Sequence, residues 1–145
     1  MWSAACRDET SASPAAVFAV LGNPATWPEW NAGVGRVDLA GPSAAGTQAV
    51  MVLPDGGELP FRITWVQAGS GYADETLVPG SDVVVRVTHE LAPSATGTRI
   101  TFRVEADAPA DVAAETGQAA SADFPEVIAA LGALAQLRAD GRDEP

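Results

Sequence analysis

Positive charge and several reactive side chains are scarce in this sequence of 145 residues. All eight basic residues are arginine, so the chain has no lysine, and it has only one cysteine and one histidine. Without lysine there is no amine for a Schiff base, for pyridoxal phosphate or for a phosphate-binding loop. The single cysteine, Cys6, cannot form an intramolecular disulfide, which predicts a reducing, cytoplasmic environment.

The charge balance and the hydrophobic pattern exclude further classes of partner. A net charge of −11 and a pI near 4.2 disfavour nucleic acid and anionic membrane surfaces, because both must be met by clustered cations. No window approaches the roughly 20 apolar residues of a membrane span, and the start of the chain lacks the features of a signal peptide. We therefore expect neither membrane insertion nor export.

Metal and cofactor sites are also not expected. One histidine, one cysteine and scattered acids give no spacing typical of a zinc site or a facial triad. The glycines fall in turns between strands, and none forms a phosphate cradle between a strand and a helix. The sequence therefore shows neither a metal-binding motif nor a phosphate-binding loop.

The residue pattern predicts one α+β domain over residues 1–138, followed by a disordered polar tail at 139–145. Residues 2–10 alternate like a strand, and two short helices follow before residue 31. Turn-forming clusters divide residues 34–107 into six further strands. Apolar residues at three and four residue spacings predict a long amphipathic helix over residues 109–138, kinked before Pro125.

Six short segments carry a resemblance to a known family, through their order and spacing along nearly the whole chain. They are residues 9–14 (ETSASP), 27–31 (WPEWN), 46–47 (GT), 73–76 (ADET), 87–91 (VTHEL) and 97–101 (GTRIT). With them the chain resembles the START-like or SRPBCC superfamily, in its polyketide cyclase/dehydrase branch. The resemblance implies the helix-grip fold of the birch-pollen allergen, a curved seven-stranded antiparallel sheet wrapped around a long C-terminal helix. It also implies a deep cavity for apolar ligands, usually without a cofactor, in members that range from carriers to cyclases.

His89 is the leading candidate for chemistry, because histidine alone among these side chains has an ordinary pKa close to neutrality. Pairing of the predicted strands through the turn at Pro79 and Gly80 places Tyr72 opposite Val87, and the next hairpin places Ile100 opposite His89. His89 then lies on an apolar face that lines the cavity, where it could act as a neutral general base. The alternative is a structural histidine that is hydrogen-bonded to the backbone and has no catalytic role.

Three further residues are candidates to assist in catalysis. Asp8 stands where the family pattern has an aliphatic residue, and either burial against the cavity wall or exposure at the sheet edge is compatible with the sequence. Tyr72 could polarise a carbonyl, although a tyrosine in a sheet core is commonly packed. Asp74 could hold a polar end of the ligand, and the adjacent Glu75 must point to the opposite face.

Large apolar side chains at strand and helix positions could line the ligand cavity, and core packing would explain most of them equally well. They are Trp30, Met51, Phe61, Trp65, Phe102 and Phe124. Arg86 and Arg103 fall on the opposite face of the sheet, where exposed cross-strand ion pairs are expected.

The sequence as a whole favours a cofactor-free enzyme of the cyclase or dehydratase type, acting on a polyketide-like or terpenoid-like molecule. His89 would be the acid/base, assisted by Asp8 or Asp74 and by Tyr72, and confinement of a flexible substrate would supply much of the catalysis. The alternatives are a non-catalytic carrier of an apolar ligand and an interaction domain with an exposed apolar patch. The sequence is compatible with a homodimer.

Overall fold

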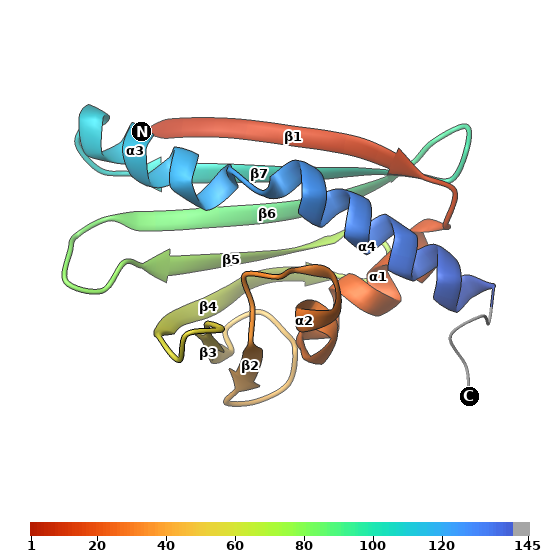
Figure 1. Ribbon diagram of the computed structural model, residues 1–145, viewed down its shortest axis with the longest axis horizontal. Coiled ribbons are helices and arrows are strands. Elements are labelled where there is room, and N and C mark those ends of the chain that lie inside the picture. Colours follow the sequence, from red (N-terminus) through yellow and green to blue (C-terminus); the bar gives the residue numbers. More distant parts are fainter. Residues whose placement is uncertain (141–145) are drawn as a thin grey trace.

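The computed structural model describes residues 1–140 and has seven strands and four α-helices there, plus one short 3-10 turn (Figure 1). The elements in chain order are β1 (Trp2–Thr10), α1 (Pro14–Leu21), η1 (Pro24–Thr26), α2 (Trp27–Trp30), β2 (Arg36–Leu39), β3 (Gln48–Val52), β4 (Glu58–Gln67), β5 (Gly71–Leu77), β6 (Val84–Pro93), β7 (Thr98–Asp107), α3 (Ala110–Ser121) and α4 (Phe124–Ala139). This order confirms the predicted α+β class and the predicted strand count.

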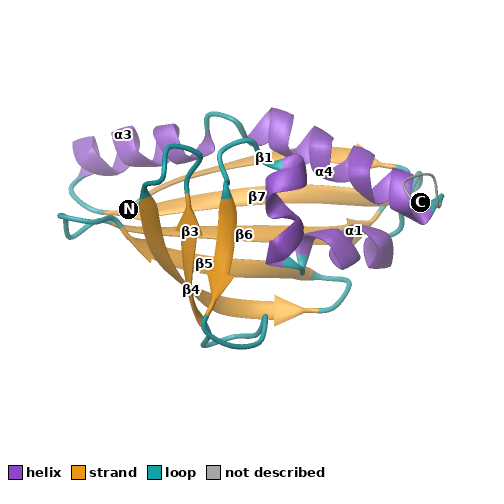
Figure 2. Cartoon of the chain, turned by 60° about the horizontal axis from the view of Figure 1, so that its bottom comes forward, coloured by secondary structure: helices purple, strands orange, loops and turns teal. Residues whose placement is uncertain are grey.

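All seven strands form one antiparallel sheet in the order β1-β7-β6-β5-β4-β3-β2. Strands β2 to β7 follow one another as a meander, while β1 pairs with β7, so that the first and last strands of the chain are neighbours. The sheet is curved, and the helices lie together on one of its faces (Figure 2). That face carries the apolar residues of each strand, so the core lies between sheet and helices.

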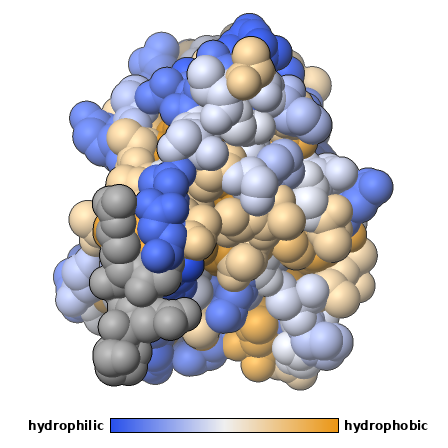
Figure 3. Space-filling model, turned by 90° about the vertical axis from the view of Figure 1, so that its right-hand side faces the viewer, coloured by the Kyte–Doolittle hydropathy of each residue, from blue (hydrophilic) through white to orange (hydrophobic). Residues whose placement is uncertain are grey.

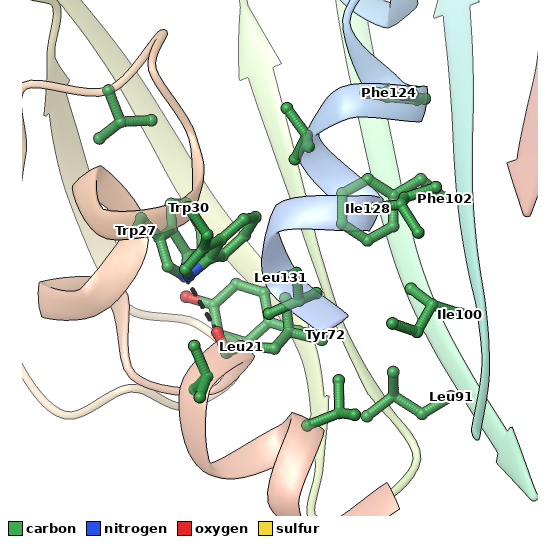
Figure 4. Packing of buried hydrophobic residues seen from close by; sticks show 14 of the residues in the cluster. Leu21, Trp27, Trp30, Tyr72, Leu91, Ile100, Phe102, Phe124, Ile128 and Leu131 are labelled. Carbon is green, nitrogen blue, oxygen red and sulfur yellow. Dashed lines mark hydrogen bonds between the residues drawn. The ribbon is translucent and has the colours of Figure 1, made fainter. Parts of the chain in front are cut away.

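Side-chain capping and proline define where the short helices after β1 begin. Ser13 caps α1 by accepting from the backbone N–H of Ala16, and Pro14 occupies the first helical turn. Past α1, the indole Nε1 of Trp27 donates to the carbonyl of Leu21 at 2.9 Å, a bond drawn in Figure 4. The two tryptophans of α2, Trp27 and Trp30, are both buried.

Helices α3 and α4 together form the predicted long C-terminal helix, and they cross the sheet diagonally (Figure 1). The helical hydrogen bonding breaks at Ala122 and Asp123, because Pro125 has no N–H to donate to the preceding turn and its ring clashes with the carbonyl four residues earlier. The predicted kink is therefore a break between two helices. Helix α4 runs to Ala139, and of the predicted polar tail, residues 141–145 lie outside the described residues.

Small residues let both helices approach strand β1 closely. A Cβ at Gly117 of α3 would overlap the ring of Trp2, and one at Gly132 of α4 would lie 2.9 Å from the Cβ of Thr10. Thr10 also donates its hydroxyl to the carbonyl of Gly132 at 3.2 Å. Figure 3 views the end of the molecule where α1 and the C-terminal part of α4 lie, and its surface carries apolar residues near the middle with polar residues around them.

The strand register differs from the prediction by two residues. Tyr72 pairs with His89 and Phe102 also pairs with His89, whereas the sequence predicted Val87 and Ile100 as the respective partners of Tyr72 and His89. The loop that closes each of these two hairpins is two residues longer than the prediction assumed. Because side chains alternate with a period of two, the predicted faces are nonetheless correct.

Among the described residues, no helix is long and apolar enough to cross a membrane.

Candidate ligand cavity and its acid–base pair

A cavity of about 640 Å³ lies between the sheet and the helices, on the side where α3 meets α4. Its wall comes from α2 and the loop after it, from strands β3 to β7, from α3 and from the first turn of α4. The lining residues are Trp27, Trp30, Asn31, Gly33, Val34, Met51, Leu53, Leu59, Asp74, Thr76, Val78, Val85, Val87, His89, Phe102, Thr116, Ala119, Ala120, Ala122, Asp123, Phe124 and Val127. Helix α1 contributes none of them. A space of this size suits a ligand of a few fused rings.

His89 lies at the cavity wall in the middle of β6, and a hydrogen bond and an aromatic contact fix the position of its ring. Its Nδ1 lies 2.9 Å from the backbone carbonyl of Tyr72, and since a carbonyl only accepts, Nδ1 carries the proton. The edge of the imidazole packs against Phe102, with ring centroids 4.4 Å apart and planes at 86°. Nε2 is then an unprotonated acceptor, and it has no hydrogen-bond partner among residues 1–140.

Asp74 projects from β5 into the same cavity. It pairs with Val87, and His89 pairs with Tyr72. Asp74 and His89 are therefore diagonal neighbours on one face of the sheet, with their Cα atoms roughly 7–8 Å apart. The Asp74 carboxyl forms no hydrogen bond or ion pair with any described residue. What surface it exposes faces the cavity, because Asp74 belongs to the cavity wall and lies on the helix-covered face of the sheet.

Burial reverses the ordinary order of proton affinity in this pair. It raises the pKa of Asp74 from 3.8 to about 7, because no cation or donor offsets the loss of water. Burial also lowers the pKa of His89 from 6.5 to about 4, with the Tyr72 carbonyl opposing the change. Between these values the cavity holds a carboxylic acid, which can donate a proton, and a neutral imidazole, which can accept one.

Six of the predicted site residues lie in the cavity wall. They are His89 and Asp74 among the candidates for catalysis, and Trp30, Met51, Phe102 and Phe124 among the candidates for ligand contact. Figure 4 shows Trp30, Phe102 and Phe124 between the helices and the sheet. Their roles in binding and catalysis stay predictions.

Trp65 does not line the cavity, contrary to the prediction from the Phe61, Ile63, Trp65 alternation. A β-bulge between Ile63 and Trp65 shifts the register, so that Trp65 pairs with Ala73 on the outer face of the sheet. Its ring lies directly against Gly71, where a Cβ would come within 2.6 Å of it. Phe61 does point inward, but it stacks on Trp27 in the core, with ring centroids 5.9 Å apart, and is absent from the cavity wall.

Tyr72 and Asp8 also lie outside the cavity wall. Tyr72 is completely buried beneath Trp27, with ring centroids 5.5 Å apart, so it does not reach a ligand. Burial raises the pKa of its hydroxyl, an effect that the nearby Ser43 hydroxyl opposes, and the Tyr72 oxygen makes no hydrogen bond of good geometry with the described residues. Asp8 sits opposite Ile100 on the edge strand β1, and its side chain is exposed. The structure thus resolves the open question for Asp8 in favour of solvent.

Sequence reasoning missed the polar residues at the wall that come from α3 and its junction with α4. Thr116 lies on α3, and Asp123 follows that helix at the break. Thr76 lies two residues after Asp74 on the face of β5 that the period of two assigns to both. No cluster of three or more metal-ligating side chains occurs within residues 1–140.

The architecture defines the class of protein: a helix-grip fold, in which a curved antiparallel sheet holds a long C-terminal helix and encloses a ligand cavity. The model of one family, described as polyketide cyclase / dehydrase and lipid transport, matches residues 2–139. The chain therefore belongs to this polyketide cyclase/dehydrase family of the SRPBCC superfamily. No curated protein matches the sequence.

Solved structures share the fold at low sequence identity. Protein MLL2253 from Mesorhizobium loti matches with a TM-score of 0.75 and 20% identity, over 92% of this chain and 96% of that one. Ara h 8.0201 matches with a TM-score of 0.70 and 15% identity, over 93% of this chain and 97% of that one. DynU16, a protein in the dynemicin biosynthetic locus, matches with a TM-score of 0.71 and 16% identity, over 96% of this chain and 48% of that one.

Proposed function

We propose that this protein is a cofactor-free acid–base enzyme of the cyclase or dehydratase type, acting on a hydrophobic polyketide-like or terpenoid-like molecule. The observation that carries the proposal is the pair of Asp74 and His89 on one cavity face, with the proton on the carboxyl and the lone pair on the imidazole. Membership of the polyketide cyclase/dehydrase family and the resemblance to a dynemicin-locus protein support it.

The pair suits the loss of water from a β-hydroxy ketone. Nε2 of His89 takes the proton next to the carbonyl, the new carbon–carbon double bond forms, and the hydroxyl leaves as water with the proton of Asp74. The enzyme is then left with an imidazolium and a carboxylate. Because Asp74 has the higher proton affinity, the proton on His89 passes to the Asp74 carboxylate and resets the site; since no hydrogen bond joins the two side chains, water in the cavity relays it.

The test is turnover of a neutral, aromatic β-hydroxy ketone, the aldol adduct of benzaldehyde and acetone, to benzylideneacetone. We expect catalysis that disappears in His89→Gln and in Asp74→Asn, while Asp8→Asn, changed at an exposed acid outside the cavity, retains it. The rate should fall below about pH 4, where His89 is protonated, and above about pH 7, where Asp74 is ionised. Activity that survives in both cavity variants would refute the proposed roles.

A carrier without catalytic activity is the second candidate. It is favoured by the largely apolar wall and by the lack of any hydrogen bond between Asp74 and His89, whose Nδ1 is engaged by the backbone. Native mass spectrometry of protein purified from its own host would identify a small molecule that travels with it. A bound compound that the protein never converts, with affinity unchanged in His89→Gln, would favour the carrier over the enzyme.

A further inference from the structure

Among residues 1–140, no basic side chain lines the cavity, although the chain has eight arginines. Arg62 and Arg86 both pair with Glu75 on the outer face of the sheet, at 2.8 and 3.2 Å. Arg103 pairs with Glu90, as predicted for that face. The remaining arginines within residues 1–140 also lie outside the wall: Arg7, Arg36, Arg99 and Arg138.

The ionisable groups that do face the cavity cannot compensate a negative charge. Asp74 from β5 and Asp123 from the junction of α3 and α4 are acids, and Asp74 has no partner among the described residues. His89 from β6 is held neutral because its ring is buried among Phe102, Trp27 and Tyr72, and the carbonyl of Tyr72 fixes its one proton on Nδ1. An anionic ligand would therefore lose its hydration without gaining any charge partner.

We propose that the cavity selects uncharged ligands and rejects those that carry a carboxylate, sulfonate or phosphate. This inference rests on the proposed small-molecule function of the cavity and names the class of ligand it takes. The unpartnered Asp74 and the Nε2 of His89 supply one donor and one acceptor for a hydroxyl or carbonyl group, while the aromatic wall takes an apolar body. The cavity would therefore exclude the carboxylate of a free fatty acid and the phosphates of a nucleotide-linked acyl group.

Two dyes of matched skeleton test the charge selectivity. N-phenylnaphthylamine is uncharged, and anilinonaphthalenesulfonate adds one sulfonate to the same rings. We expect the uncharged dye to bind with enhanced fluorescence, and the sulfonate to bind more than about tenfold more weakly, since an unpaired buried charge is costly. Equal affinities would overturn the selectivity while leaving the cavity function intact. Binding of neither dye would overturn the cavity function, and with it this inference.

A single added cation should then invert the preference. Met51, half-buried in the cavity wall on β3, is close in shape to lysine, and Met51→Lys should tighten sulfonate binding at least about tenfold. Leu77→Lys adds the same charge at a site that is 58% exposed and outside the cavity, so it should change neither affinity. Leu53→Lys, half-buried at the same wall, replaces Met51→Lys if that variant does not fold. No gain in the cavity variant, or an equal gain in Leu77→Lys, would refute the proposal.

Discussion

Replacing Asp74 or His89 by an uncharged amide should change protein stability with opposite pH dependence. The two variants are Asp74→Asn and His89→Gln, and both keep the approximate size of the side chain. Both groups lie on the same face of the sheet, and burial moves their pKa values in opposite directions. The free energy of unfolding therefore falls with rising pH because of Asp74 and falls with decreasing pH because of His89.

Ionised Asp74 destabilises the fold. Because its ordinary pKa of 3.8 rises to about 7 on folding, the native state holds a proton that the unfolded chain releases between these values. Stability is then lost as the pH rises from about 4 to about 7. The difference corresponds to about 4 kcal/mol at about 1.4 kcal/mol per pKa unit, an upper bound because water in the cavity solvates the carboxylate. We expect Asp74→Asn to recover roughly 2–4 kcal/mol above pH 7 and little near pH 4.

His89 contributes with the opposite sign. Its pKa falls from 6.5 to about 4 in the fold, so between these values the unfolded chain binds a proton that the native state refuses. Stability is lost as the pH falls from about 6.5 to about 4, by an upper bound of about 3 kcal/mol. His89→Gln should recover stability at the acid end, while its amide still donates to the carbonyl of Tyr72.

Urea unfolding followed by tryptophan fluorescence measures both effects, since Trp27 and Trp30 are buried. The experiment compares each variant with the parent protein from about pH 4 to about pH 8 at constant ionic strength, so that other titrating groups cancel. The reasoning is refuted if the two difference curves run parallel, or if Asp74→Asn is less stable than the parent at the alkaline end.

Three further predictions follow from single contacts. The affinity for an apolar dye should fall as the pH rises through about 7, because the bound dye displaces the water that would solvate ionised Asp74. Asp74→Asn should abolish this pH dependence in a fluorescence titration. Tyr72→Phe should leave the free energy of unfolding unchanged or raise it by up to about 1 kcal/mol, since it removes an unpartnered hydroxyl; a larger loss in urea unfolding would show a bonded one. Thr98→Val should cost about 1–3 kcal/mol by the same assay, because the Thr98 hydroxyl donates to the buried carbonyl of Ala12 at 2.7 Å, whereas Thr101→Val on the other strand face should cost less.

Most of the fold could be predicted from local signals. Proline, glycine and serine mark the ends of the helices and the turns, and the period of two along β5, β6 and β7 assigns each side chain to a face. This parity was enough to place His89, Asp74 and Phe102 on the covered face, although the predicted register was wrong by two residues. A slip by an even number moves neighbours but does not turn a side chain over.

The parts that were wrong depend on features with no local signature. The bulge in β4 adds one residue to a strand whose sequence alternates regularly, and only the pairing with β5 places Trp65 outside. Tyr72 and Phe61 do point inward, but whether an inward ring packs or lines a void depends on Trp27, which fills the space above both. Asp8 shares the covered face of β1, yet an edge strand leaves it in solvent.

The reversal of proton affinity in the cavity follows from burial of two side chains that have no charge partner. Burial keeps the imidazole of His89 neutral, and the carbonyl of Tyr72 fixes its proton on Nδ1, while no donor or cation among the described residues pairs with Asp74. The arginines that could have paired with Asp74 lie on β4 and β6 with their side chains on the outer face, where Glu75, the adjacent residue, binds both. One residue of strand alternation thus separates a paired, exposed carboxylate from an unpaired acid in the cavity. A cation on the inner face would abolish both the acid and the selectivity for uncharged ligands, so the two properties have one structural cause.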